Sequence, residues 1–314
     1  MGSNMKTPVT FIIFKRPDTT EKVFEVIRQI KPSKLFVIAD GPRADRDGEA
    51  EKCEAARKII ERVDWDCEVI KNYSDVNLGC AKRVSSGLDW VFGNVEETII
   101  LEDDCIPHPT FFQFCKELLE KYRYDTRVAS ITAQNAQMGR KRTNYSYYFS
   151  AYSHCWGWAS WRRAWQSYDL HIKLWKEVQE SNILNNILMD DRAVSYWSRV
   201  FQSVYDNPTG ITWDYQWTFA CWMQGALSII PNVNLVSNVG LGTDSTNFTS
   251  GQEFSFMNIA TEAMEFPLQH PPFMVRNLEA DKFIQKTVYG ESTLQMVKQE
   301  LKKVIGYSTS TFKN

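Results

Sequence analysis

The stretch Thr98-Ile-Ile-Leu-Glu-Asp-Asp-Cys-Ile-Pro-His-Pro-Thr110 decides the fold of this chain. Its first four residues are β-branched or apolar, which is typical of a buried strand. Three carboxylates follow directly at 102–104, and prolines at 107 and 109 then interrupt the chain. From 111 to 122, apolar side chains recur at i, i+3 and i+4 spacing, which predicts a helix. The stretch therefore predicts a strand, an acidic turn and a helix.

The same alternation extends on both sides of this stretch. Apolar runs predict strands at 9–14, 35–39, 67–70, 98–101 and 128–132. Helical patterns separate the earlier strands, including one over 49–63. This order predicts an α/β fold with a mostly parallel, Rossmann-like mixed sheet and helices on both faces. In such sheets, ligands bind at the carboxyl ends of the strands.

The second half of the chain is unusually aromatic. The chain holds 11 Trp, 13 Tyr and 18 Phe, and many of them lie between 145 and 222. Strands are predicted at 145–150 and 226–231, helices at 182–188 and 194–205, and a further helix opening at 212. The segment 155–165 is predicted to begin as a loop and become a helix. We expect residues 5–132 to form a nucleotide-sugar-binding half, 133–278 an acceptor-binding and catalytic half fused to it, and 279–314 a tail that wraps the surface.

Composition excludes several classes of protein. The 314 residues include 36 Lys and Arg against 38 Asp and Glu, so no basic excess indicates a nucleic-acid partner. No apolar run is long enough for a transmembrane segment. The 7 Cys are scattered without a Cys-x-x-Cys pair, which argues for reduced thiols and against structural zinc. We expect a cytoplasmic protein, with attachment at the inner membrane as a second expectation.

The acidic triplet Glu102, Asp103 and Asp104 has two interpretations. Three consecutive carboxylates after a buried strand repel one another, and a divalent cation such as Mn²⁺ or Mg²⁺ would offset that cost. The alternative is an acidic turn whose side chains cap the next helix. Because neighbouring residues of an extended chain point to opposite sides, Glu102 and Asp104 are expected to share one face, with Asp103 pointing away.

The run Ile-Leu-Glu-Asp-Asp-Cys-Ile-Pro-His-Pro-Thr-Phe-Phe at 100–112 resembles the Glu-Asp-Asp motif of the GT-A fold glycosyltransferases, of the N-acetylglucosaminyltransferase I type. Further blocks follow the order of that family: Arg16, Gly157-Trp158 and Trp213-Asp214. Bacterial family-2-like sugar transferases are also similar. The resemblance covers roughly 8–250 as ordered short motifs, and it implies the GT-A, nucleotide-diphospho-sugar transferase fold.

The resemblance implies roles for the triplet and for residues of the nucleotide side. Asp104 would bind the Mn²⁺ that bridges the phosphates of a nucleotide-sugar, Asp103 would meet the ribose or a metal-bound water, and Glu102 would accept hydrogen bonds from the donor sugar. Arg16 and Arg83 would lie near the nucleotide, and Asp40 would meet the uracil ring. The alternatives are a surface charge for Arg16, a turn residue for Asp40 and a solvated helix face for Arg83.

The acceptor side is expected to involve Trp156, Trp158 and Trp213, although Trp158 also has the spacing of a core residue. Asp214 is the expected catalytic base, and its alternative is a simple helix cap. Other carboxylates that could serve are Asp169, Asp190, Asp191 and Asp244. Many GT-A enzymes add a late His to the metal, but none lies in 238–250; His270, before two prolines, is a candidate, and the favoured alternative for it is a structural role. The loop 240–251 is expected to act as a mobile lid.

The resemblance implies a metal-dependent, inverting glycosyltransferase (a hexosyltransferase) of bacterial polysaccharide biosynthesis. It would move a sugar from a UDP-sugar, with UDP-N-acetylglucosamine the first choice, to a carbohydrate or other hydroxyl acceptor. A sugar nucleotidyltransferase is an alternative, but that class usually needs a Gly-rich phosphate loop, and 9–17 holds no glycine. A non-catalytic carbohydrate-binding domain of GT-A type is another.

Overall fold

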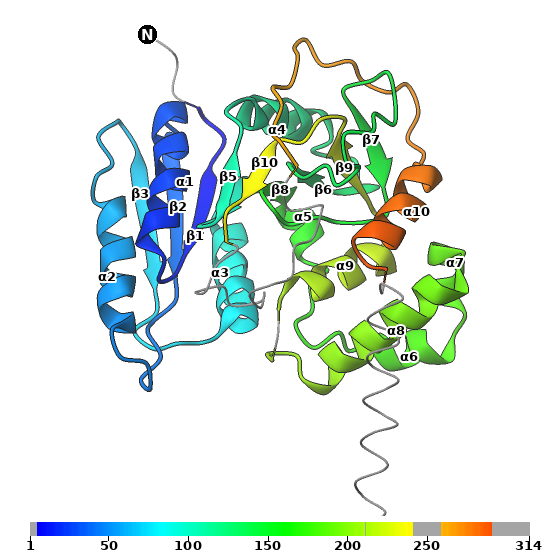
Figure 1. Cartoon of the computed structure of the whole chain (residues 1–314), viewed down its shortest axis with the longest axis horizontal. Coiled ribbons are helices and arrows are strands. Elements are labelled where there is room, and N and C mark those ends of the chain that lie inside the picture. Colours follow the sequence, from blue (N-terminus) through cyan, green and yellow to red (C-terminus); the bar gives the residue numbers. More distant parts are fainter. Residues whose placement is uncertain (1–4, 211, 241–258, 291–314) are drawn as a thin grey trace, which may run out of the picture.

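The chain folds around one large mixed sheet with helices on both faces (Figure 1). The structure is a computed structural model that describes residues 5–210, 212–240 and 259–290. The main sheet has 8 strands in the order β3-β2-β1-β4-β8-β6-β9-β7. The α/β fold with helices on both faces of a Rossmann-like mixed sheet, expected from the sequence, is therefore confirmed.

Parallel strands form the first half of the sheet: β1 (Val9–Ile13), β2 (Lys34–Ala39), β3 (Glu68–Tyr73) and β4 (Glu97–Glu102). They are connected by α1 (Pro17–Ile30), α2 (Glu49–Ile60) and α3 (Cys80–Asn94). Successive side chains of a strand point to opposite faces. In β2, Leu35 and Val37 accordingly join the cluster that includes α1, whereas Phe36 and Ile38 join the cluster of α3. Because both of their faces are covered, β1 and β2 and the middle of β4 are almost continuously apolar, whereas the edge strand β3 is partly polar and has no buried residue.

The acidic turn leads from the main sheet into a smaller one. Strand β5 (Cys105–Pro107) pairs with β10 (Val236–Asn238) in antiparallel fashion. Helix α4 (Thr110–Lys121) follows where the apolar spacing predicted it, and buries Phe111, Phe114 and Leu118. Strand β6 (Val128–Thr132) returns the chain to the main sheet with the predicted bounds.

The segment 155–165 differs from the prediction of a loop that becomes a helix. It contains a buried strand, β8 (Trp158–Trp161), followed by the short α5 (Arg162–Trp165). Trp158 and Trp161 have helical spacing, but they lie in different core clusters on opposite faces of the sheet. Pairing with β4 on one side and β6 on the other stabilises the strand. Those partners are distant in the sequence, so local spacing did not reveal it.

The far edge of the sheet is formed by β9 (Leu227–Pro231) and β7 (Tyr147–Ser150). A separate layer of helices packs beside it: α6 (Trp175–Glu180), α7 (Ile183–Leu188), α8 (Asp191–Asp206) and α9 (Asp214–Met223). Its core is aromatic, with Trp175, Trp197, Phe201 and Trp222 buried together. This cluster accounts for much of the aromatic content of the second half.

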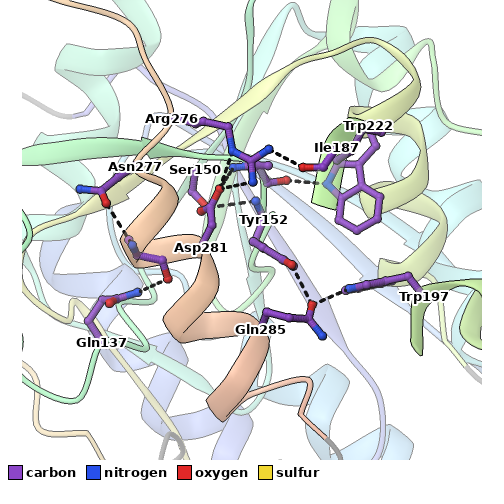
Figure 2. Close-up of polar contacts among 12 residues, drawn as sticks. Gln137, Ser150, Tyr152, Ile187, Trp197, Trp222, Arg276, Asn277, Asp281 and Gln285 are labelled. Carbon is purple, nitrogen blue, oxygen red and sulfur yellow. Dashed lines mark hydrogen bonds and ion pairs between the residues drawn. The ribbon is translucent and has the colours of Figure 1, made fainter. Parts of the chain in front are cut away.

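Helix α10 (Leu278–Thr287) belongs to the region that the sequence predicted as a surface-wrapping tail. Its residues Ala280 and Ile284 are buried, so the described part is packed into the molecule. Figure 2 shows the polar contacts that hold it: Asp281 meets Ser150 and Arg276, and Gln285 accepts hydrogen bonds from Tyr152 and Trp197. Residues 291–314 lie outside the described residues.

The two expected halves share one core. Strand β8 of the second half lies between β4 and β6 of the first, so a single sheet crosses the expected boundary at 132. In the part of the chain that the structure describes, none of the helices has both the length and the apolar character needed to cross a membrane.

Candidate active site

The candidate site is built on the turn that follows β4. Glu102 ends this strand, and the register pairs it with Ile12 of β1, so the carboxyl ends of both strands meet at this edge. Asp103 is buried, whereas Glu102 and Asp104 are partly exposed. This alternation agrees with the expectation that Glu102 and Asp104 share one face and Asp103 points away. The triplet therefore gives the sheet edge two accessible carboxylates and one internal carboxylate.

Arg16 joins the acidic turn to the turn that follows β1. Its Nη2 atom donates to Asp103 Oδ1 at 2.5 Å and to Asp104 Oδ2 at 2.9 Å. The backbone N–H of Phe14 donates to the other oxygen of Asp103 at 3.0 Å. Burial alone would lower the pKa of Arg16, but the two carboxylates outweigh it, so the net shift of this pKa is upward. Arg16 is thus a fixed cation that holds Asp103 inside the turn, and the surface-charge alternative is wrong.

The cluster still carries more negative than positive charge. Burial raises the pKa of Glu102 well above its usual value, and the nearby carboxylates of Asp104, Asp103 and Asp214 raise it further. The positive charge of Arg16 offsets only part of this rise in the pKa of Glu102. Burial also raises the pKa of Asp103, which the charge of Arg16 partly offsets. A group with a further positive charge would therefore be stabilised at this edge.

Asp214 approaches the same cluster from the helical layer. It is the first residue of α9, and its carboxylate accepts a hydrogen bond from the Thr212 hydroxyl. Burial raises the pKa of Asp214, and Thr212 together with the first backbone N–H groups of the helix lowers it in part. Trp213, and not Asp214, occupies the N-cap position of α9, and within the described residues no side chain forms a capping hydrogen bond there. The Asp214 carboxylate lies within electrostatic reach of Glu102, and its role as the catalytic base stays a prediction.

Several residues around Asp214 were not identified from the sequence. Cys80, at the start of α3, has a pKa that burial raises and that Glu102 and Asp214 raise further. Burial likewise raises the pKa of Cys155, Tyr168 and Tyr289, with Asp214 among the added causes for each. These residues come from separate elements and share no motif, so only the tertiary structure brings them to the site.

Gly240, which follows β10, lies against Asp104 and Arg16. Val239 N–H donates to the carbonyl of Asp104 at 2.8 Å, which brings the chain after β10 onto the acidic turn. A Cβ at position 240 would lie 2.1 Å from Asp104 Oδ2 and 2.9 Å from Arg16 Nη1. Only glycine fits there without displacing that carboxylate. The rest of the predicted lid, together with Asp244, lies outside the described residues.

Two residues expected to bind the nucleotide have structural partners. Asp40 accepts hydrogen bonds from the N–H groups of Gly41, Leu78 and Gly79 and from the Asn77 amide, which occupies both of its oxygens. Arg83 is buried and donates to the carbonyl and side chain of Asn72. The hydrogen bonds of Asp40 stabilise a turn, which agrees with its alternative interpretation as a turn residue. Arg83 joins α3 to the end of β3.

Two of the three tryptophans expected on the acceptor side lie in the core. Trp158 and Trp213 are buried and stack on each other with ring centroids 5.5 Å apart. In this arrangement neither ring offers a face to a sugar, because adjacent side chains cover it. Trp156 is partly buried beside the main core and is the one of the three with accessible surface.

Asp169, Asp190 and His270 have partners away from the acidic turn. Asp169 accepts from the N–H groups of His171 and Lys173 in a turn, and Asp190 caps α8 through Ala193 N–H at 2.8 Å. His270 contacts Glu117 and Tyr147 beside β7, far along the sheet from β4. These contacts agree with the structural role that was the favoured alternative for His270.

A divalent cation fits the donor chemistry of the acidic turn only if a ligand shares it. Within residues 5–210, 212–240 and 259–290, no group of three or more His, Cys, Asp or Glu side chains is arranged to hold a metal. The partly exposed Glu102 and Asp104 are oxygen donors of the kind that Mg²⁺ and Mn²⁺ prefer. The excess negative charge fits a cation, and phosphate oxygens of a bound ligand would have to supply the remaining donors.

Comparisons with known proteins give only partial likenesses. No family model matches the chain, and no curated protein matches it. The structure of 4-diphosphocytidyl-2C-methyl-D-erythritol synthase from Anaerococcus prevotii aligns over 56% of this chain and 78% of its own, at 9% identity and a TM-score of 0.30. The inositol-1-phosphate CTP transferase from T. maritima aligns over 53% and 74%, at 12% identity and a TM-score of 0.28. A UDP-glucose pyrophosphorylase bound to UDP-glucose aligns over 48% and 64%, at 11% identity and a TM-score of 0.27.

These solved structures are described as a synthase, a CTP transferase and a pyrophosphorylase, and none of the three is described as a glycosyltransferase. Membership of the GT-A family stays a prediction from the sequence, because no family model matches the chain. Because the TM-scores are low, the activity of this chain is argued from its own residues.

Proposed function

We propose that this chain is a metal-dependent glycosyltransferase that uses a nucleotide-diphosphate sugar, with a UDP-sugar as the first choice of donor. The observation that carries the proposal is the excess of carboxylates at the end of β4, where Arg16 is the cation bonded to both Asp103 and Asp104. Such a cluster favours a divalent cation together with a diphosphate, because each compensates the charge of the other.

Residues of the acidic turn and Arg16 would bind the donor. Asp104 would hold Mn²⁺ or Mg²⁺ together with the diphosphate, and Arg16 would contact the nucleotide while keeping Asp103 in place. Glu102 would accept hydrogen bonds from the donor sugar. When bound, the cation would stabilise negative charge on the leaving diphosphate.

Asp214 supplies the proton acceptor in this proposal. The acceptor hydroxyl oxygen forms a bond to the anomeric carbon, the bond from that carbon to the diphosphate breaks with inversion, and the hydroxyl proton passes to the Asp214 carboxylate. A base with a raised pKa suits this step, because it binds the proton more firmly as the new bond forms. Burial raises the pKa of Asp214 in this way. Trp156 is the aromatic side chain proposed for the acceptor side.

Nucleotidyl transfer is the second candidate, because enzymes of that class also use acidic residues and a metal. In that reaction the phosphate of a sugar phosphate would bond to the α-phosphate of a nucleoside triphosphate, and pyrophosphate would leave. The reaction would not need Asp214 as a base for an acceptor hydroxyl. The third candidate, a non-catalytic carbohydrate-binding domain, would release neither product.

Product release from two substrate panels separates the three candidates. One panel holds UDP-sugars with and without Mn²⁺, read as UDP release, and the other holds nucleoside triphosphates with sugar phosphates, read as pyrophosphate release. Metal-dependent UDP release supports glycosyl transfer, pyrophosphate release supports the second candidate, and binding without either product supports the third.

Asp214→Asn then tests the assigned base. Loss of a general base lowers turnover by roughly 10²–10⁴-fold while donor binding stays near normal. Asp190→Asn is the matched control, because Asp190 caps a helix of the same layer outside the acidic cluster. Asp244→Asn tests the rival carboxylate. Transfer at the wild-type rate by Asp214→Asn would remove Asp214 from the mechanism.

A further inference from the structure

The segment from residue 259 to 277 crosses the molecule beside the β7 edge and is fixed along its length (Figure 1). Met264 N–H donates to Thr110 Oγ1 at 2.9 Å, and Gln269 N–H donates to Ser146 Oγ at 2.8 Å. At its end, Arg276 forms an ion pair with the buried Asp281 at 2.8 Å (Figure 2). These contacts hold the segment at three points along its length.

Apolar side chains are nevertheless displayed along this fixed segment. Phe273 is 56% exposed, Val275 is 66% exposed and Leu278, at the start of α10, is 40% exposed. Scattered exposed apolar residues are normal, but a contiguous group of them marks an interaction site. Phe273, Val275 and Leu278 line one shallow cavity of about 470 Å³ beside β7, so they do form a group.

Cations border the same cavity. Arg142 lines it together with the three apolar residues, and Arg140 and Lys141 directly precede it on the surface. Arg140 and Arg142 lie over the Phe283 ring at 4.4 and 5.2 Å, which orients them on this side of the molecule. Within the described residues, none of these three cations forms an ion pair. The acidic residue at the cavity, Glu279, is paired with Lys282 at 3.4 Å.

This basic–apolar patch, formed by Arg140, Lys141, Arg142, Phe273, Val275 and Leu278, does not resemble a peptide groove. The edge of β7 is already covered, because Phe149 pairs with Arg276 and its carbonyl accepts from Asn277 N–H at 2.7 Å. A peptide strand therefore finds no free edge to extend there. Cations that form no ion pair within the described residues, beside exposed apolar side chains, instead match a surface of anionic head groups above an acyl layer.

We infer that the basic–apolar patch docks this protein onto an anionic lipid bilayer. Arg140, Lys141 and Arg142 contact the head groups, and Phe273, Val275 and Leu278 insert among the upper parts of the acyl chains. The patch lies at the β7 end of the sheet, several strands away from Glu102 at the end of β4. The inference therefore stands whether the acidic site performs glycosyl or nucleotidyl transfer.

Sedimentation with lipid vesicles tests the inference. The full chain is mixed with vesicles of phosphatidylcholine alone, or of phosphatidylcholine with phosphatidylglycerol, at low and high salt. We expect it to pellet with the anionic vesicles, less so at high salt, and little with the neutral ones. Lys141→Glu should weaken anionic binding by about fivefold or more, since one cation near such a surface contributes roughly that factor. Phe273→Ser/Val275→Ser should weaken it at both salt concentrations.

Matched controls remove the same kind of side chain elsewhere. Val76→Ser changes an exposed apolar residue, and Lys58→Glu reverses an exposed cation of α2. Both should bind vesicles like the wild type, and circular dichroism checks that every variant is folded. Wild-type protein that does not pellet with anionic vesicles at low salt would overturn the inference, as would equal effects of patch and control variants. Binding to an acidic protein through Lys141 without any vesicle binding would also overturn it.

Discussion

Asp281→Asn should weaken the attachment of α10 to the edge of the sheet. The Asp281 carboxylate accepts from Ser150 Oγ at 2.5 Å, from Ala151 N–H at 3.2 Å and from Arg276 Nε at 2.9 Å. The residue is only 2% exposed. Burial raises the pKa of Asp281, while Ser150 and Arg276 lower it in part and so favour the charged form. Asparagine keeps the shape but loses the charge, and its amide group must face one of these donors.

The magnitude follows from burial. Removing one partner of a buried charge pair costs on the order of 3–5 kcal/mol, because the other charge stays buried without compensation. Arg276 is 20% exposed at its side chain and regains some water, so we expect about 3 kcal/mol. Urea unfolding at neutral pH, followed by tryptophan fluorescence, measures this loss. Comparing Asp281→Asn, Arg276→Gln and the double variant isolates the coupling between the two side chains.

Asp64→Asn is the matched control for this experiment. Asp64 accepts from Arg28 Nε at 3.0 and 3.1 Å, which resembles the contact between Arg276 and Asp281. Both side chains of the control pair are 41–50% exposed, so water replaces the lost bonds and stability should hardly change. If Asp281→Asn lost no more stability than Asp64→Asn, burial would not be what makes the α10 contact strong, and the reasoning would fail.

Other predictions concern the candidate site and its surroundings. Gly240→Ala places a methyl group where Asp104 Oδ2 lies, so calorimetry should show weaker binding of Mn²⁺ with UDP while the unfolding midpoint changes little; unchanged binding would contradict the close approach. Asp40→Asn should cost roughly 1–3 kcal/mol of stability, because its oxygens accept four hydrogen bonds, and should leave the preference among nucleotides unchanged; altered base preference would restore its nucleotide role. Burial lowers the pKa of His154 from 6.5 to about 4, so the unfolded chain binds more protons between these values and stability is lost as the pH falls through them. Unfolding curves of His154→Gln against pH should therefore show a smaller acid loss than the wild type, and an equal loss would exclude His154 as a cause.

Local patterns were sufficient for most of the fold. The apolar run before Glu102 and the helical spacing after Pro109 depend on neighbouring residues only, and both elements lie where they were predicted. The alternation of strands and helices likewise indicated the parallel half of the sheet, because strands covered on both faces are apolar throughout. The acidic triplet could also be identified from neighbouring residues alone, because three carboxylates directly after an apolar strand repel one another and resist burial.

Only the tertiary structure decided what those residues contact. Arg16 and Asp103 are 87 positions apart in the sequence, yet their bond joins two turns at the sheet edge. Strand β8 was missed because its partners, β4 and β6, lie elsewhere in the chain, and a four-residue strand has little periodicity of its own. Asp40, which was expected at a nucleotide, accepts four hydrogen bonds within a turn, and Trp158, which was expected at an acceptor, is buried in the core. A sequence pattern reports which side chains prefer burial or charge, whereas the partner that satisfies each preference is selected by how distant segments pack.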